Sequence, residues 1–484
     1  MNQETPLRWT TDRALVVTVL ISLALKLALA VLAERNAPVL DEGAYLTLAR
    51  RLAETGQFEG TFRPPLYPAF QALFLAGGVG TLGIRIAQVI LSSISVVLVY
   101  RIAQREAGLR AARIAAVLVA FNPILIAFSH RLWSETLFIF LLLAAFDLLA
   151  RPATAGGLRR WLVAGIALGL GALTRPMLVT FLPFIVLWGV LQLKRERERL
   201  NPATGLIRLS FLLITCGLVI LPWTVRNMRT TGDFVLIDSN GPFNILVGAQ
   251  PESRFVDKDD VWSWRFGRVA DQGYVQLVAL EPARAQALAM EGAISHVRAD
   301  PRGFLAKSWW EAGHIWTLDS FLLRHLRNRW YGAVPGWFTP LVTVAAAGWF
   351  ALVVLAGFVG VTVSRPSPFR GLLLLLLLQY TLLFAATYAL SRYAVPLQAL
   401  LAIPAGAFLA DPRGTLDRAR SGLIPVHRLA LLGLVLVSLA FAWRRDLPLL
   451  GDMMTAGGSH HRFYMEEAPS AGDLRMNRAP QRIP

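Results

Sequence analysis

Residues 14–33 read ALVVTVLISLALKLALAVLA, with Lys26 as the one charge in the stretch. A helix of about 20 apolar residues is long enough to cross the hydrocarbon core of a bilayer. The stretch exceeds the apolar core of a cleavable signal sequence, so we expect it to remain as a membrane span. Similar apolar stretches recur along the chain, so this stretch indicates a membrane protein with several spans.

The composition supports that conclusion. Of 484 residues, 55% are hydrophobic and 16% are charged, whereas soluble domains carry roughly a quarter charged residues. We predict an all-α polytopic membrane protein with about 11 transmembrane helices. Beyond the first stretch, the predicted spans are 83–103, 111–128, 133–150, a shorter pair at 161–174 and 177–193, then 205–223, 338–363, 371–390, 393–410 and 427–443.

The net charge of +17 reflects membrane topology and does not indicate a nucleic-acid partner. Lys and Arg accumulate in cytoplasmic loops of membrane proteins, and the basic clusters of this chain fall in every second predicted loop. That alternation places the N-terminus in the cytoplasm and residues 41–42 outside. The basic clusters lie near 105–113, 151–160, 194–199 and 413–428.

Two external segments are long. The first, at 34–80, contains DEGAYLTLARRLAETG, whose apolar residues recur at helical spacing, so we expect juxtamembrane helices there. The second, at 225–336, has short β-like runs around Asn240–Gly241, which predicts a small domain of mixed structure. Residues 1–410 form the expected transmembrane catalytic module, and 411–484 the last span and a polar tail.

Carboxylates and arginines collect at the predicted outer ends of the spans. A lipid-phosphate sugar would place its phosphate at this level, where arginines bind it and stabilise it as a leaving group. One carboxylate then suffices as general base for the acceptor hydroxyl, whereas a glycosidase needs two flanking the bond. The residues concerned are Asp41, Glu42, Arg63, Arg131, Glu135, Arg175, Arg226, Arg229 and Arg392.

Each of these residues also has a simpler interpretation. Asp41 can be the cap of a helix, Glu42 a solvated neighbour, and Glu135 a negative charge at a helix start. The arginines can anchor to lipid headgroups. No pair of histidine, cysteine or acidic residues has helical metal-ligand spacing, so we predict no metal site, although the sequence leaves a divalent cation open as cofactor.

Several motifs resemble the GT-C superfamily of glycosyltransferases, in particular bacterial integral membrane proteins of the protein O-mannosyltransferase-like group, family 39. They occur in the family order between about residues 14 and 410. They read LDEGAYLTLARRL (40–52), FRPPLYPAF (62–70), RLWSETLFIFLLLAAFDLLA (131–150), GLGALTRPMLVTFLPF (169–184), LPWTVRNMRTTGDFVLIDSNGPFNILVG (221–248), HVRADPRGFLAKSWW (296–310) and SRYAVPLQALLAIPAG (391–406).

The resemblance implies a GT-C type fold and a polyprenyl-phosphate-linked sugar as donor. It implies that Asp41 is the catalytic base, with Glu42 beside it and Glu135 as second acidic residue, and that Arg63 and Arg392 help to hold the lipid phosphate. We add Arg226 to the donor phosphate-binding set. Related aminoarabinose transferases use an acidic residue for a metal where Phe62 stands here, which puts that metal site in doubt.

We therefore predict an inverting glycosyltransferase of the bacterial inner membrane, with its active site on the periplasmic side. Its acceptor would be a lipid, a glycan or a protein. A polytopic transporter or lipid flippase is the main alternative, but that class places charges near the bilayer midplane and often shows inverted repeats. A non-catalytic assembly factor of the cell envelope would explain the spans but not the cluster of acids and arginines.

Overall fold

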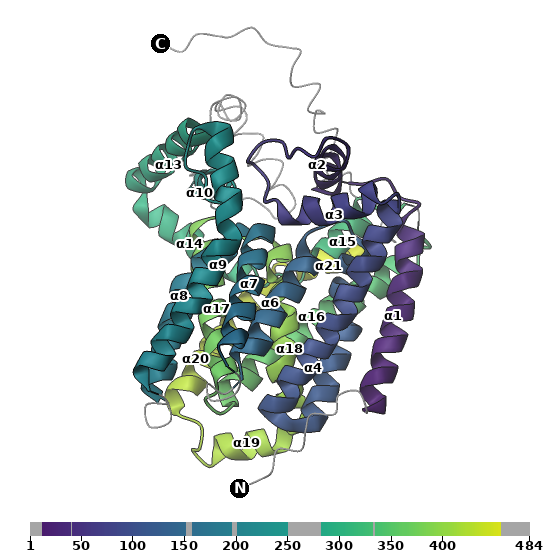
Figure 1. The fold of residues 1–484 in the computed structure, drawn as a ribbon. Coiled ribbons are helices and arrows are strands. Elements are labelled where there is room, and N and C mark those ends of the chain that lie inside the picture. The colour runs from purple at the N-terminus through teal and green to yellow at the C-terminus, as the bar shows by residue number, and fades with distance from the viewer. Residues whose placement is uncertain are drawn as a thin grey trace.

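The computed structural model describes residues 12–39, 41–151, 157–195, 201–249, 282–332 and 334–455. In these residues every regular element is a helix. The long helices run side by side in one bundle, and the shorter helices cover one of its ends (Figure 1). The chain is a multi-pass membrane protein with the predicted all-α architecture.

The long helices are α1 (Arg13–Ala33), α4 (Gly80–Ala120), α6 (Glu135–Leu149), α7 (Leu158–Thr174), α8 (Leu182–Arg195), α9 (Pro202–Thr231), α16 (Phe338–Val363), α17 (Pro368–Ala386), α18 (Val395–Ala410) and α20 (Val426–Arg444). The shorter helices are α2 (Asp41–Thr55), α3 (Leu66–Ala76), α5 (Pro123–His130), α10 (Gly241–Ala249), α13 (Pro282–Ala299), α14 (Pro301–His314), α15 (Phe321–Arg327), α19 (Pro412–Arg420) and α21 (Leu447–Thr455). Two 3-10 helices, η2 (Pro176–Phe181) and η5 (Ser391–Ala394), precede α8 and α18.

Length and hydropathy identify the helices that can cross a bilayer. In the described part of the chain there are eight such helices, or nine if α5 and α6, which meet at 114°, form one broken span. This test counts α4 once and leaves out the 17-residue helix α7. The predicted number of eleven spans therefore stays a prediction.

Helix α4 reverses direction at Gly108, which has φ 85° and ψ −177°. An L side chain is strained in that conformation, so glycine suits the turn. The carboxylate of Asp12 accepts hydrogen bonds from Tyr100 Oη at 2.6 Å and from Arg113 Nε at 3.0 Å, one from each arm. The two arms therefore correspond to the two spans predicted on either side of Gly108.

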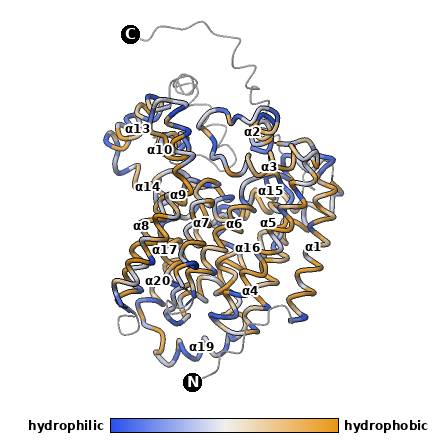
Figure 2. The backbone as a smooth tube through the Cα atoms, in the orientation of Figure 1, coloured by the Kyte–Doolittle hydropathy of each residue, from blue (hydrophilic) through white to orange (hydrophobic). Residues whose placement is uncertain are grey.

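Hydrophilic residues gather at the two ends of the bundle, and hydrophobic residues predominate between them (Figure 2). At the end near α19, Asp147 accepts hydrogen bonds from Arg105 and Arg151, each at 2.7 Å. Two of the predicted cytoplasmic basic clusters are thus in contact. Helices α2, α3, α10 and α13, which belong to the two predicted external segments, lie at the opposite end (Figure 1). The side of the membrane that this end faces stays a prediction.

The expectation of β structure around Asn240–Gly241 is wrong for the described residues, because α10 begins at Gly241 and 233–240 forms no strand. The backbone carbonyls of this segment are bonded by side chains of α9. Asn227 Nδ2 donates to the carbonyls of Val235 and Ile237, both at 3.1 Å. Side-chain donors of α9 therefore satisfy these carbonyls without a neighbouring strand.

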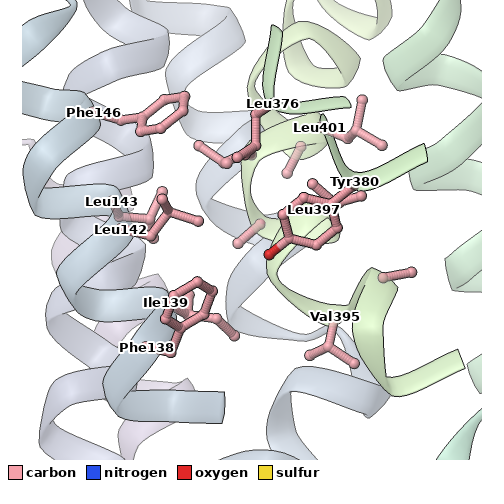
Figure 3. Close-up of a cluster of buried hydrophobic side chains, with 14 of the residues drawn as sticks. Phe138, Ile139, Leu142, Leu143, Phe146, Leu376, Tyr380, Val395, Leu397 and Leu401 are labelled. Atoms are coloured by element: carbon pink, nitrogen blue, oxygen red, sulfur yellow. The ribbon is translucent and has the colours of Figure 1, made fainter. Parts of the chain in front are cut away.

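A buried apolar cluster fixes α6 against α17 and α18 (Figure 3). Phe138, Leu142 and Phe146 of α6 face Leu376 of α17 and Leu397 of α18. Because α6 begins at Glu135 and Arg392 lies just before α18, this packing sets the separation of the two helix ends that carry predicted site residues.

The C-terminal region returns to the end of the bundle that carries the external segments. After α19 and α20, the buried carboxylate of Asp446 accepts hydrogen bonds from Thr317 Oγ1 at 2.9 Å and from the Leu318 amide at 2.7 Å. Residues 317–318 belong to the second long external segment. The predicted polar tail lies outside the described residues after 455.

Candidate active site

Asp41 is the first residue of α2, and two arginines bind its carboxylate. Arg63 Nη2 lies 2.8 Å from Asp41 Oδ1, and Arg392 Nη1 lies 2.7 Å from Asp41 Oδ2. Arg63 comes from the loop before α3 and Arg392 from η5, so three distant parts of the chain meet here. The side chain of Asp41 is therefore a partner of two cations, which goes beyond the simple role of a helix cap.

Glu135 joins the same network through Arg392. Arg392 Nε lies 3.8 Å from Glu135 Oε1, and Arg175 Nη2 donates a hydrogen bond to that same oxygen. Arg175 follows α7, at the break between the two short predicted spans. Arg392 thus lies between the carboxylates of Asp41 and Glu135, and its guanidinium carbon lies 5.1 Å from the centre of the Trp133 ring.

The electrostatic balance keeps Asp41 ionised. Burial raises the pKa of the Asp41 carboxyl, but the Arg392 and Arg63 guanidinium groups lower it more, to below its usual range. Burial lowers the pKa of Arg63, and the charge of Asp41 more than restores it. Arg63 also lies 5.4 Å from the centre of the Tyr45 ring. The cluster is a fixed set of opposite charges in a partly dehydrated site.

Glu42 points away from this network despite its place next to Asp41. It is fully buried, so it is not the solvated neighbour of the simpler interpretation. Its Oε2 atom lies 3.1 Å from Arg131 Nη1, and its Oε1 atom accepts the Leu132 amide at 2.8 Å. The Val39 amide donates to Glu42 as well, at 3.1 Å. These bonds tie the start of α2 to the segment before α6.

Arg226 lies on α9 and contacts the first external segment. It donates hydrogen bonds to the backbone carbonyls of Phe58 and Gly60, and its guanidinium carbon lies 4.8 Å from the centre of the Trp223 ring. Its described partners do not include the carboxylates of Asp41 or Glu135. The structure thus brings Asp41, Arg63, Glu135 and Arg392 together, and places Glu42 and Arg226 beside that group.

The sequence did not reveal the partners of two arginines in this region, and one acid was overlooked. Arg131 and Arg175 were expected near the other site residues, but nothing in their spacing reveals that they pair with Glu42 and Glu135. Asp238, in the segment before α10, was overlooked because it lies 175 positions from Arg63, whose charge acts on it. Only the fold brings these partners together.

A metal site is a separate question. Within the described ranges, no group of three or more histidine, cysteine or acidic residues is arranged to hold a metal ion. The carboxylates of Asp41 and Glu135 have arginine partners instead. The described chemistry of the site is therefore that of guanidinium groups and carboxylates, which can bind an anion and accept a proton.

The fold and site define a polytopic membrane protein whose acids and arginines meet at one end of the helix bundle. The family model for dolichyl-phosphate-mannose-protein mannosyltransferase matches residues 62–223. The proposed mannosyltransferase YycA of Bacillus subtilis is 34% identical over 166 residues, which is 34% of this chain and 23% of YycA.

Among solved structures, one of an oligosaccharyltransferase shows a similar fold. The oligosaccharyltransferase AglB of Archaeoglobus fulgidus, solved with an inhibitory peptide and a dolichol-phosphate, aligns with a TM-score of 0.50 at 14% identity. The alignment covers 92% of this chain and 56% of the AglB chain. ArnT of Cupriavidus metallidurans, bound to undecaprenyl phosphate, aligns with a TM-score of 0.39 at 14% identity, over 84% of this chain and 79% of that one.

The family model thus matches about a third of the chain, and the likeness to AglB shows a similar fold. The chain spans about a quarter of the length of YycA and about half that of AglB, with 23% and 56% covered. The fold class predicted from the sequence motifs is thereby confirmed.

Proposed function

We propose that this protein is an inverting glycosyltransferase that moves a monosaccharide from a polyprenyl-phosphate-linked donor to a hydroxyl acceptor. The reaction takes place at the periplasmic face of a bacterial inner membrane. One observation carries the proposal, namely that Asp41 lies between Arg63 and Arg392 at distances of 2.8 and 2.7 Å. The family description, which names a dolichyl-phosphate sugar, supports a lipid-phosphate donor.

Arg63 and Arg392 are suited to hold the donor phosphate. A guanidinium presents a fixed fork of N–H donors that matches phosphate oxygens and stays charged at any working pH. In the free protein the carboxylate of Asp41 occupies these donors. A donor phosphate competes with Asp41 for them, and the same arginines then stabilise the charge that develops on the departing phosphate.

Asp41 is the general base of the proposed reaction. With both arginines bound, its pKa lies below its usual range, and a carboxylate in that condition is a weak base. When the phosphate draws the guanidinium groups toward itself, the pKa of Asp41 rises and the carboxylate can accept the proton of the acceptor hydroxyl. Attack on the anomeric carbon from the face opposite the phosphate inverts its configuration.

The other predicted site residues act by positioning Asp41, Arg63 and Arg392. Glu135 holds Arg392 and Arg175 in place, and Glu42 fixes the start of α2 on which Asp41 lies. Arg226 contributes to donor binding by holding the loop at Phe58 and Gly60, a few residues before Arg63. Each of these contacts orients a group that would touch the substrate.

The test uses the full-length chain purified into lipid nanodiscs. It is given a set of undecaprenyl-phosphate sugars, with lipid, glycan and peptide acceptors, and the products are analysed by mass spectrometry. We expect transfer of one sugar and release of undecaprenyl phosphate, with inverted anomeric configuration. Vesicles containing the protein and a fluorescent lipid-linked sugar test the competing activity. Movement of that lipid across the bilayer without any sugar transfer would contradict the proposal.

A further inference from the structure

Asp238 is held beside the loop that carries Arg63. The amide of Ser239 donates to the carbonyl of Thr61 at 2.9 Å, and Thr61 Oγ1 donates to Ser239 Oγ at 3.3 Å. On its other side the segment is fastened to α9, where Trp223 Nε1 donates to the Ile237 carbonyl at 2.8 Å. The position of Asp238 is thus fixed by bonds on both flanking residues.

The carboxyl of Asp238 has no cationic partner in the described structure. Arg63 is close enough for its charge to act on Asp238, but its Nη2 atom binds Asp41. The side chain of Asp238 is half-buried and accepts the backbone amide of Asn240. Burial raises the pKa of this carboxyl to about 7, and Arg63 lowers it by less.

A carboxyl in this place is suited to a neutral hydroxyl and not to a phosphate. It would repel a phosphate, whereas each of its oxygens can accept hydrogen bonds from hydroxyl groups, and in its protonated form it can donate one. If Arg63 holds the donor phosphate, the atoms joined to that phosphate lie within a few ångströms of the guanidinium. On the reactive side those atoms belong to the sugar.

We propose that Asp238 is a specificity-determining residue whose carboxyl hydrogen bonds a hydroxyl of the sugar on the lipid-phosphate donor, while Arg63 holds the phosphate. The inference rests on the proposed function and assigns a second role within the same site. It makes a separable prediction, because removal of Asp238 weakens recognition of the sugar and leaves recognition of the lipid phosphate intact.

The experiment compares the affinities of the full chain in nanodiscs for bare undecaprenyl phosphate and for its mannose, glucose, galactose and aminoarabinose forms. The wild type is expected to bind one glycosylated form more tightly than the bare lipid phosphate. Asp238→Ala should lower affinity for that form by about tenfold or more, as expected for loss of a hydrogen bond to a charged group. Its affinity for bare undecaprenyl phosphate should stay within about twofold.

Asp233→Asn is the matched control, because Asp233 lies five residues earlier in the same segment and is half-exposed. It should leave the affinities for the bare and the glycosylated lipid unchanged. Asp238→Asn keeps the shape of the side chain and so tests for an effect of misfolding. Equal losses for the bare and the glycosylated lipid in Asp238→Asn and Asp238→Ala would overturn the assignment. Unchanged affinity of these variants for both lipids would also overturn it. So would a wild type that binds no glycosylated form more tightly than the bare lipid phosphate. Arg63→Ala should weaken both lipids, and failure of that result alone would count against the proposed function instead.

Discussion

Arg392 Nη1 lies 2.7 Å from Asp41 Oδ2, although the two residues are 351 positions apart in the chain. Arg63 binds the other oxygen of the same carboxylate. Both oxygens of Asp41 are therefore engaged by groups that also suit a phosphate. A donor phosphate therefore has to compete with the Asp41 carboxylate for the two arginines in the proposed reaction.

Asp41→Asn removes the proton acceptor while it keeps the size of the side chain. We expect the rate of sugar transfer to fall by about 10²–10⁴-fold, the usual contribution of a general base. Affinity for bare undecaprenyl phosphate should be equal or higher, because the amide holds Arg63 and Arg392 less strongly than a carboxylate does. Initial rates and binding to nanodiscs measure the two effects. Asp417→Asn, at an exposed position of α19, is the control, and undiminished transfer in Asp41→Asn would refute the base assignment.

Arg392→Lys keeps the charge but loses the fork of donors. Arg392 reaches Asp41 through Nη1 and Glu135 through Nε, and a lysine ammonium is a single point that cannot span both in this geometry. We expect donor affinity to drop by about tenfold, as for one lost charge-assisted hydrogen bond. Titration with undecaprenyl phosphate measures it. Arg229→Lys, at an exposed position of α9, should change nothing, and equal affinities in the two variants would argue against bidentate binding.

The sequence was sufficient for the features that depend on local patterns. Apolar runs predicted the long helices, and the helical spacing of the apolar residues in the first external segment predicted α2. Alternation of basic loops placed Asp41 and Arg392 at one end. Each of these inferences needs only neighbouring residues or a count of charges.

The pairing of acids with arginines was beyond the reach of the sequence. Asp41 and Glu42 are adjacent acidic residues in the same sequence context. The first binds Arg63 and Arg392, whereas the second binds Arg131. The direction of each side chain depends on how α2 rests on the bundle, which no periodicity encodes. The wrong expectation of β structure has a similar cause, because side chains of α9 supplied the bonds that a strand would have supplied.

Glu42→Gln tests whether Glu42 stabilises the fold or takes part in the reaction. The change leaves Arg131, which is also buried, without its counter-charge. Loss of one partner of a buried ion pair lowers the free energy of unfolding by about 3–5 kcal/mol. We expect a lower midpoint of thermal unfolding and normal activity per folded molecule. Glu54→Gln, at an exposed position of the same helix, is the control. Normal stability with lost transfer would instead assign Glu42 a direct catalytic part.

The pH dependence of stability gives a test of Asp238 that needs no substrate. The pKa of its carboxyl is raised from 3.8 to about 7 in the folded protein, chiefly by burial. Between these values the folded state holds a proton that the unfolded state has released, so this group makes stability fall as pH rises from about 4 to about 7. Above about 7 its contribution no longer changes with pH.

Asp238→Asn should remove that decline. Thermal unfolding of the wild type and the variant is measured from pH 4 to pH 8. The difference between their free energies of unfolding is expected to widen as pH rises and to become constant above about 7. Subtraction of the two curves cancels titrating histidines common to both. Asp41 does not interfere, because its pKa is lowered below its usual range and it stays ionised throughout this window. A difference that is constant from pH 4 to pH 8 would contradict the raised pKa of Asp238, because a carboxyl that is exposed or held ionised by a cation has finished titrating in both states below this window.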